Sequence, residues 1–198
     1  MSKLYFRYGV MNCGKSLELL TKNYGFKRRG VETLLLKSEI DTRDSGVIRT
    51  RFKDTFEKCE SIKKDTDVFL TVAQYISDGH KPKWILVDEA QFLTPAQVDQ
   101  LARIVDVLDI DVICFGLRTD FKTQLFPGSK RLFEVADTLE ETKSTCDCGN
   151  RASVNARVDK DWNIVKEGAQ VEVGSEDKYI TLCRKCYYER LNNNKQYE

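Results

Sequence analysis

The chain has 198 residues, of which 41% are hydrophobic and 32% are charged. This length and composition allow one packed domain with a small satellite, and they exclude both wholesale disorder and a large multi-domain motor. Lysine and arginine total 32 against 31 aspartates and glutamates, so the formal charge of +1 provides no overall field that would attract nucleic acid or an acidic membrane.

Targeting signals and cysteine usage indicate the compartment. No apolar run is long enough to span a bilayer, and residues 1–30 lack the apolar core of a secretory signal, so the expected location is the cytoplasm. Disulfides are rare there, and the seven cysteines are therefore better explained by burial or metal binding.

The first predicted elements are a strand, a tight loop and a helix. Residues 3–8 predict the strand, and residues 15–29 predict a helix with three large apolar residues at helical spacing, Leu17, Leu20 and Tyr24. Between them, GVMNCGKS matches the phosphate-binding pattern GxxxxGKS in the context that this pattern requires.

A loop of this type binds the phosphates of a nucleotide. Its backbone N–H groups point at phosphate oxygens, Lys15 reaches the β- and γ-phosphates, and Ser16 holds Mg²⁺. The predicted ATP-binding residues of the loop are Gly9, Val10, Met11, Asn12, Cys13, Gly14, Lys15 and Ser16.

Three further compact apolar runs, at residues 31–37, 84–87 and 111–116, predict buried strands. Helical segments alternate with them, as in a doubly wound fold. The expected fold class is therefore α/β: a P-loop NTPase-like parallel sheet with helices on both faces.

Two connections between these strands differ in character. Residues 41–53 are polar and charged, which predicts a long exposed loop. Further along, Thr94, Pro95 and Gln97 predict a capping box at the start of a helix.

The strand at residues 84–87 ends in two acids, Asp88 and Glu89. Such a pair is often only solvated, but ligands of a parallel sheet gather at the carboxyl ends of its strands, and a phosphate loop is already predicted there. We expect Asp88 to orient Mg²⁺ and Glu89 to accept a proton from an attacking hydroxyl or water. Asp88, Glu89, Ala90 and Gln91 complete the predicted ATP site.

After about residue 144 the pattern changes to short alternating runs, at residues 152–158 and 169–173. We predict one domain over residues 1–143, a small β-rich domain over residues 144–191, and a frayed tail over residues 192–198.

Four cysteines in this second part form two close pairs: Cys146, Cys148, Cys183 and Cys186. Four thiolates suit a tetrahedral Zn²⁺ ion, whereas reduced, unligated surface cysteines are the alternative. Because four protein ligands leave no open coordination position, we expect such an ion to be structural.

Several aromatic residues follow the acids and the glycine-bearing segments: Phe92, Phe121, Phe126 and Tyr179. Flat apolar rings can clamp a base, although each ring taken alone is more often part of a core.

In this order, the segments closely resemble the compact, zinc-containing thymidine kinases. The resemblance covers about residues 4–188 and rests on GVMNCGKS, DTR at 41–43, DEAQF at 88–92, GLRTDF at 116–121, LFPGS at 125–129, the paired cysteines, and DKY at 177–179 followed by CRKC. It implies transfer of a phosphoryl group from ATP to the 5′-hydroxyl of deoxythymidine, which gives dTMP.

The resemblance also implies roles for individual residues. Glu89 would be the general base, Arg157 would lie beside the transferred phosphate together with Lys15, and Asp41 and Arg43 would approach Mg²⁺. The residues implied around the thymine are Met11, Leu117, Phe121 and Phe126, with Val171, Val173, Gly174 and Tyr179 of a loop that reads the base largely through backbone groups. Phe92 is added to the substrate-binding candidates because its ring directly follows the acids. A homotetramer and feedback inhibition by dTTP are expected through this resemblance alone.

Two other functions remain open. A zinc-knuckle NTPase could grip a nucleic-acid strand with residues 41–53 and the metal module, but the near-zero net charge and the lack of a basic stripe argue against it. A broader deoxynucleoside kinase is the other alternative, because base selectivity depends on loop geometry. We expect neither nucleic acid nor a membrane as a partner.

Overall fold

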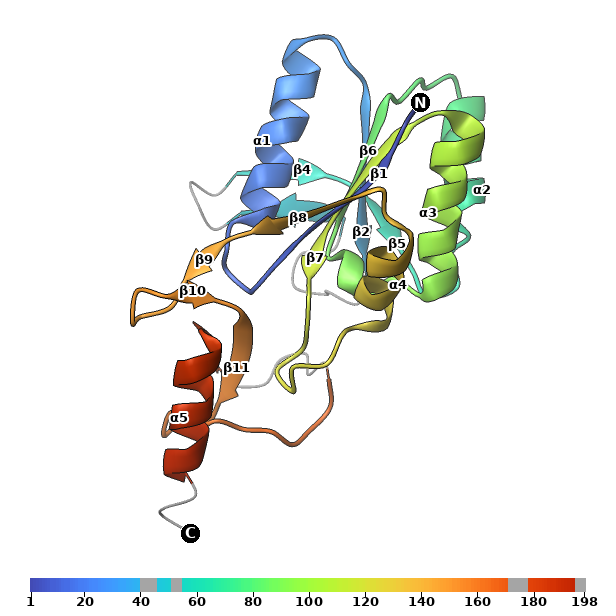
Figure 1. Ribbon diagram of the computed structural model, residues 1–198. Helices are drawn as coiled ribbons and strands as arrows, with labels where there is room; N and C mark the ends of the chain where they lie inside the picture. Colours follow the sequence, from blue (N-terminus) through green and yellow to red (C-terminus); the bar gives the residue numbers. More distant parts are fainter. Residues whose placement is uncertain (40–45, 51–54, 171–177, 195–198) are drawn as a thin grey trace.

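A six-stranded parallel sheet forms the centre of the computed structural model, which describes residues 1–39, 46–50, 55–170 and 178–194 (Figure 1). The strand order is β5-β2-β6-β7-β1-β8. The strands are β1 (Leu4–Gly9), β2 (Thr33–Ser38), β5 (Glu60–Ile62), β6 (Trp84–Asp88), β7 (Asp111–Leu117) and β8 (Thr138–Thr142). The predicted α/β class and its parallel sheet are confirmed.

Helices cover both faces of the sheet, as predicted. Helix α1 (Lys15–Arg28) lies on one face, whereas α2 (Val68–Ser77), α3 (Pro95–Leu108) and α4 (Pro127–Val135) lie on the other (Figure 1). Apolar strand residues alternate between the two faces: Leu35 packs into the α1-side core, whereas Leu34 and Leu36 pack into the core beneath α2 and α3. This explains why the strand sequences are continuously apolar.

Helix α1 is present as predicted, but of the three apolar residues that marked it only Leu20 is buried. Leu17 and Tyr24 are 37% and 64% exposed, whereas Leu19 and Leu20 are buried against the sheet together with Asn23. A polar residue is tolerated there because the Thr33 hydroxyl donates a hydrogen bond to the Asn23 side-chain oxygen at 2.5 Å.

The expectation of an exposed loop over residues 41–53 was wrong for its middle part. Strand β3 (Val47–Arg49) pairs with β4 (Phe56–Lys58) in an antiparallel ladder. The Ile48 side chain is fully buried in the α1-side core, which fixes this hairpin on the sheet. Residues 41–45 and 51–53 of the predicted loop lie outside the described residues.

The predicted capping box at the start of α3 is confirmed. The Thr94 hydroxyl accepts from the Gln97 backbone N–H at 3.2 Å, and the Gln97 side-chain oxygen accepts from the Thr94 N–H at 3.0 Å. The Gln97 side-chain amide also donates to the Lys63 carbonyl at 2.7 Å. The helix start is therefore tied to the chain that precedes α2.

The C-terminal part consists of two short ladders and one helix. Strand β9 (Ser144–Thr145) pairs with β10 (Arg151–Ala152), β11 (Val154–Val158) pairs with β12 (Lys178–Leu182), and α5 (Arg184–Asn194) follows. The strand predicted at residues 152–158 is present, with a break at Ser153.

The other predictions for this part need correction. Residues 169 and 170 are not in a strand, residues 171–173 lie outside the described residues, and the second strand is β12 instead. Helix α5 continues to Asn194, three residues into the expected tail. Among the described residues, no helix has the length and apolar composition needed to cross a membrane.

Candidate functional site

The phosphate loop connects β1 to α1 at the carboxyl edge of the sheet. Asn12 and Gly14 have positive φ angles of 57° and 89°, and Gly14 is the N-cap residue of α1. The Lys15 ammonium folds back over the loop and donates a hydrogen bond to the Val10 carbonyl at 2.7 Å. The start of α1 and the Lys15 ammonium thus give this loop positive potential where an anion would bind.

At Gly9, the first residue of the phosphate loop, neighbouring atoms leave no room for a side chain. A Cβ atom at this position would lie 2.6 Å from the Cys13 sulfur and 2.7 Å from the Thr142 carbonyl oxygen. Strand register places Gly9 directly beside Thr142, the last residue of β8. Any side chain at residue 9 would therefore displace the loop from the sheet.

Asp88 lies beside the phosphate loop, at the end of β6. The Ser16 hydroxyl donates to the two Asp88 carboxylate oxygens at 3.1 and 3.3 Å. Burial, with a smaller contribution from the negative charge of Glu89, raises the Asp88 pKa to about 7. A hydroxyl and a carboxylate side by side are oxygen ligands of the kind that Mg²⁺ prefers.

Glu89 is held in place by Gln91. Glu89 has a positive φ of 52° and begins the short 3₁₀ helix η2 (Ala90–Phe92). The buried Gln91 side chain donates to the Glu89 carboxylate at 2.5 Å and accepts from the Leu117 N–H at 2.9 Å. The Gln91 side chain thus fixes the Glu89 carboxylate relative to the end of β7.

Helix α4 packs closely on η2 through Gly128. A Cβ atom there would lie 2.6 Å from the carbonyl oxygens of both Ala90 and Leu93. The Ser129 hydroxyl donates to the Leu117 carbonyl at 2.6 Å, which ties the same helix to β7. The glycine and serine of LFPGS are therefore required by the packing around the acids.

The aromatic rings that were predicted to bind the base make two separate contacts. Phe92 meets Phe126 edge-on, with ring centroids 5.6 Å apart, and the Arg157 guanidinium lies 5.1 Å above the Phe121 ring. Phe121 and Phe126 are buried, as is Arg157. Such burial fits a packing role as directly as it fits contact with a base.

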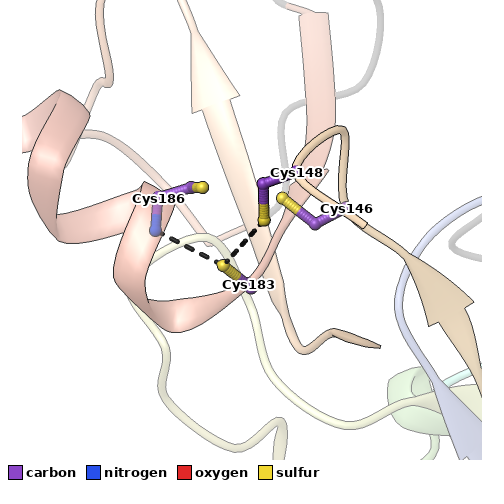
Figure 2. A group of neighbouring side chains, drawn as sticks. All are labelled: Cys146, Cys148, Cys183 and Cys186. Carbon is purple, nitrogen blue, oxygen red and sulfur yellow. Dashed lines mark hydrogen bonds between the residues drawn. The ribbon is translucent and has the colours of Figure 1, made fainter. Parts of the chain in front are cut away.

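The four cysteines come together as expected (Figure 2). Their sulfur atoms all lie within 4.8 Å of one another, although they come from the β9–β10 turn and from the junction of β12 and α5. Four thiolates around a tetrahedral Zn²⁺ have sulfurs about 3.8 Å apart, so the donor set fits such an ion. Hydrogen bonds from Asn150 lower the Cys148 pKa to about 6, whereas hydrogen bonds with Cys148 and Cys183 raise the Cys186 pKa to about 12, so without a metal a thiolate is favoured at only one of these two sulfurs.

Comparison with known proteins gives the family. A sequence model described as "Thymidine kinase" matches residues 2–187. The chain belongs to the thymidine kinase family. Curated thymidine kinases match over nearly their full length: that of Zymomonas mobilis is 43% identical over 98% of this chain and 100% of its own, and that of Pasteurella multocida is 42% identical over 96% and 99%.

A third relative, the thymidine kinase of Streptococcus thermophilus, is 45% identical over 95% of this chain and 94% of its own. Among solved structures, a DNA replication initiation factor aligns at 18% identity with a TM-score of 0.40, over 71% of this chain and 40% of that one. The family assignment rests on the relatives in sequence and not on the replication initiation factor.

Some residues that the thymidine kinase resemblance singles out are outside the described part of the chain: Asp41, Arg43, Val171, Val173 and Gly174. Tyr179 is described, and it is the direct partner of Arg157 in the β11–β12 ladder. The Met11 N–H donates to the Asn155 side-chain oxygen at 2.7 Å.

Sequence reasoning missed two buried polar residues near this thymidine kinase site. Lys37 lies opposite Asp88 in the β2–β6 register, is almost fully buried, and donates to the Val47 carbonyl at 3.4 Å. Asn155 lies on β11 behind the phosphate loop. In both cases the available signal was a polar residue within a predicted strand, and such a residue does not reveal a partner that is distant in sequence.

Proposed function

We propose that this thymidine kinase transfers the γ-phosphoryl group of ATP to the 5′-hydroxyl of deoxythymidine, giving dTMP for the synthesis of DNA precursors. The observation that carries the proposal is the contact between Ser16 and Asp88, with Glu89 fixed beside it by Gln91. A phosphate loop, an oxygen site for Mg²⁺ and a candidate base thus meet at one edge of the sheet in a chain of this family.

The phosphate loop would bind the triphosphate of ATP. Backbone N–H groups over residues 12–16 and the start of α1 favour anionic oxygens, and Lys15 carries the positive charge toward the β- and γ-phosphates. The Met11 N–H is engaged by Asn155. Ser16 and Asp88 would hold Mg²⁺, which neutralises charge on the phosphates when bound.

Glu89 would act as the general base. A hydrogen bond from Gln91 limits the orientation of the Glu89 carboxylate. The carboxylate would accept the proton of the 5′-hydroxyl as that oxygen attacks the γ-phosphorus in line with the leaving oxygen. Arg157 would stabilise charge on the transferred group, and the protein would otherwise act by positioning.

The proposal has further parts. The four clustered cysteines would hold a structural Zn²⁺ ion. Residues 1–143 would form the kinase domain and residues 144–191 the metal domain. A cytoplasmic location is proposed from the sequence, whereas feedback inhibition by dTTP and a homotetrameric assembly are proposed from the family resemblance alone.

The first experiment measures ADP release from Mg·ATP with different acceptors: none, thymidine, deoxyuridine, deoxycytidine, deoxyadenosine, deoxyguanosine and single-stranded DNA. We expect turnover with thymidine and deoxyuridine only. Turnover with most deoxynucleosides would indicate a broader kinase, whereas ADP release stimulated only by DNA would overturn the proposal.

A substitution at Glu89 tests the mechanism. Glu89→Gln keeps the size of the side chain but removes its basicity, so turnover should fall about 100-fold or more while both substrates still bind. Turnover is measured at saturating substrates, and binding is measured by titration calorimetry. Glu134→Gln on the surface of α4 is the matched control and should retain full activity. Near-normal turnover of Glu89→Gln would contradict the base assignment.

A further inference from the structure

The first half of the phosphate loop is supported by the C-terminal part of the chain. Val10 is buried in the same apolar cluster as Cys146 and Cys183, and Cys13 packs against this cluster. The cluster is separate from the two cores of the central sheet. The loop that would bind ATP therefore rests on the core that surrounds the cysteines.

Asn155 adds a polar connection to this apolar one. Its side chain is 2% exposed, accepts from the Met11 N–H at 2.7 Å and donates to the Thr119 carbonyl at 3.0 Å. The Asn155 side-chain oxygen thus holds the backbone of the phosphate loop, and its side-chain NH₂ group holds the backbone that follows β7. A buried amide of this kind fixes its partners, because an unpaired backbone group there would cost free energy.

Strand β11 carries this connection to the cysteines. Asn155 pairs with Thr181 in the β11–β12 register, and Leu182 lies beside Val154 immediately before Cys183. The Ser153 N–H donates to the Leu182 carbonyl at 2.9 Å. The path from phosphate loop to cysteine cluster is therefore one continuous set of hydrogen bonds and packed side chains.

A metal on the four cysteines would determine whether this path is rigid. Its ligands come from both sides of the module, the β9–β10 turn and the start of α5. Without that cross-link, the β11–β12 ladder is a two-stranded sheet on a small core, which is marginally stable by itself. Asn155 and Val10 would then no longer hold the phosphate loop in one conformation.

We propose that Asn155 and Val10 couple the metal centre to the phosphate loop, so that nucleotide binding and metal retention strengthen each other. The coupling rests on the proposed function, since it needs a nucleotide on the loop and a metal on the cysteines. A preformed loop binds phosphate more tightly than one that must be ordered. By linkage, a nucleotide that stabilises the loop must increase metal affinity by the same factor.

The test is the affinity of the protein for Zn²⁺. A chromogenic chelator competes with the protein for Zn²⁺ at equilibrium, with and without saturating Mg·ATP, and the fraction of Zn²⁺ on the chelator is read by absorbance. We expect Mg·ATP to protect the bound Zn²⁺ from the chelator by raising the affinity about five-fold or more, within the usual range of coupling between sites. ATP affinity of the zinc-loaded protein is measured separately by titration calorimetry.

Two variants remove the coupling by different routes. Asn155→Leu removes both hydrogen bonds at similar volume, and Val10→Ala removes apolar contact with the cysteine core. Each should still bind Zn²⁺ through all four cysteines, bind ATP more weakly than wild type, and lose most of the protection by Mg·ATP. Asn163→Ala, in an exposed turn of the same part of the chain, is the control and should behave as wild type.

The outcomes separate the coupling from the function. ATP binding with an unchanged affinity for Zn²⁺ would overturn the coupling and leave the kinase proposal intact. No ATP binding at all would overturn both. Full protection in a folded Asn155→Leu or Val10→Ala variant would refute the role of that residue, and the wild-type measurement decides the coupling even where a variant does not fold.

Discussion

Asp88 gives the site a dependence on pH. Burial raises its pKa to about 7, whereas an aspartate in an unfolded chain titrates near 4. Between about pH 4 and pH 7 the folded protein keeps a proton that the unfolded chain has lost, so stability from this group falls as the pH rises through that window.

We therefore expect the free energy of unfolding, measured in urea without nucleotide or Mg²⁺, to decrease from pH 5 to pH 7.5 more steeply in wild type than in Asp88→Asn. The variant has no titrating group at residue 88, so the difference between the two profiles isolates this carboxyl. Mg²⁺ and ATP should flatten the wild-type profile, because a bound cation favours the carboxylate. Parallel profiles for the two proteins would contradict the assignment.

At the scale of single residues, the sequence reveals candidate catalytic and ligand residues more readily than the residues that hold them in position. Lys15, Ser16, Asp88 and Glu89 are recognisable because each follows a local pattern at the end of a strand or in a loop. Their placement at one edge fits the expectation, while their roles as ligands and base stay predictions.

The supporting residues are harder to find. Asn155 contacts Met11, which is 144 residues away, and Gln91 contacts Leu117. A buried amide has no local signature, because what makes it necessary is a backbone group elsewhere in the chain. Lys37 is equally hard to recognise, because only the β2–β6 strand register places it beside Asp88.

At the element scale, two glycines in helices should respond oppositely to the same substitution. Gly128→Ala, in α4, places a methyl group within 2.6 Å of two carbonyl oxygens of the chain around η2. We expect a loss of about 1–3 kcal/mol in the free energy of unfolding and a fall in turnover, because η2 carries the groups beside Glu89.

Gly25→Ala, in α1, is the matched control. A Cβ atom there meets nothing within 4 Å, and its φ is not in the left-handed region. The substitution should stabilise the protein by about 0.5–1 kcal/mol through helix propensity and leave turnover unchanged. Urea denaturation and turnover of both variants give the comparison. A tolerated Gly128→Ala would show that α4 does not set the position of η2.

The elements that were predicted correctly are those with local causes. The capping box of α3 needs only residues Thr94 to Gln97, and the strands β2, β6 and β7 are apolar on both faces. Strands β3, β5, β8 and β12 were not predicted, because each becomes a strand only through its partner strand.

The spacing of apolar residues does not by itself identify the buried face of α1. Apolar residues at positions 17, 19, 20 and 24 fit more than one helical face, and only packing against the sheet decides between them. Asn23 on the buried face weakens the pattern further, since its partner Thr33 lies on another element.

At the scale of the whole molecule, strand order explains why the site and the metal module are neighbours. Strand β1 lies between β7 and β8, so the phosphate loop begins, at Gly9, beside Leu117 on one side and Thr142 on the other. Strand β8 leads directly into β9 and the first cysteine pair. The C-terminal part thus begins where the phosphate loop begins, and contact between them follows from topology.

Removal of the metal should consequently unfold one part of the molecule before the other. The core around the cysteines is separate from the two cores that cover the faces of the central sheet, and the core beneath α2 and α3 is the largest of the three. With a strong chelator, we expect amide hydrogens of β11 and β12 to exchange rapidly while those of β1 and β7 stay protected.

Hydrogen exchange read by mass spectrometry measures this directly, and Cys148→Ser should reproduce the effect of the chelator. Cys59→Ser, outside the cluster, should not, because Cys59 packs against the α1-side core. If β1 and β7 lost protection together with β11 and β12, the metal would stabilise the whole molecule. If all four strands kept their protection, the cysteine cluster would not depend on a metal for its fold.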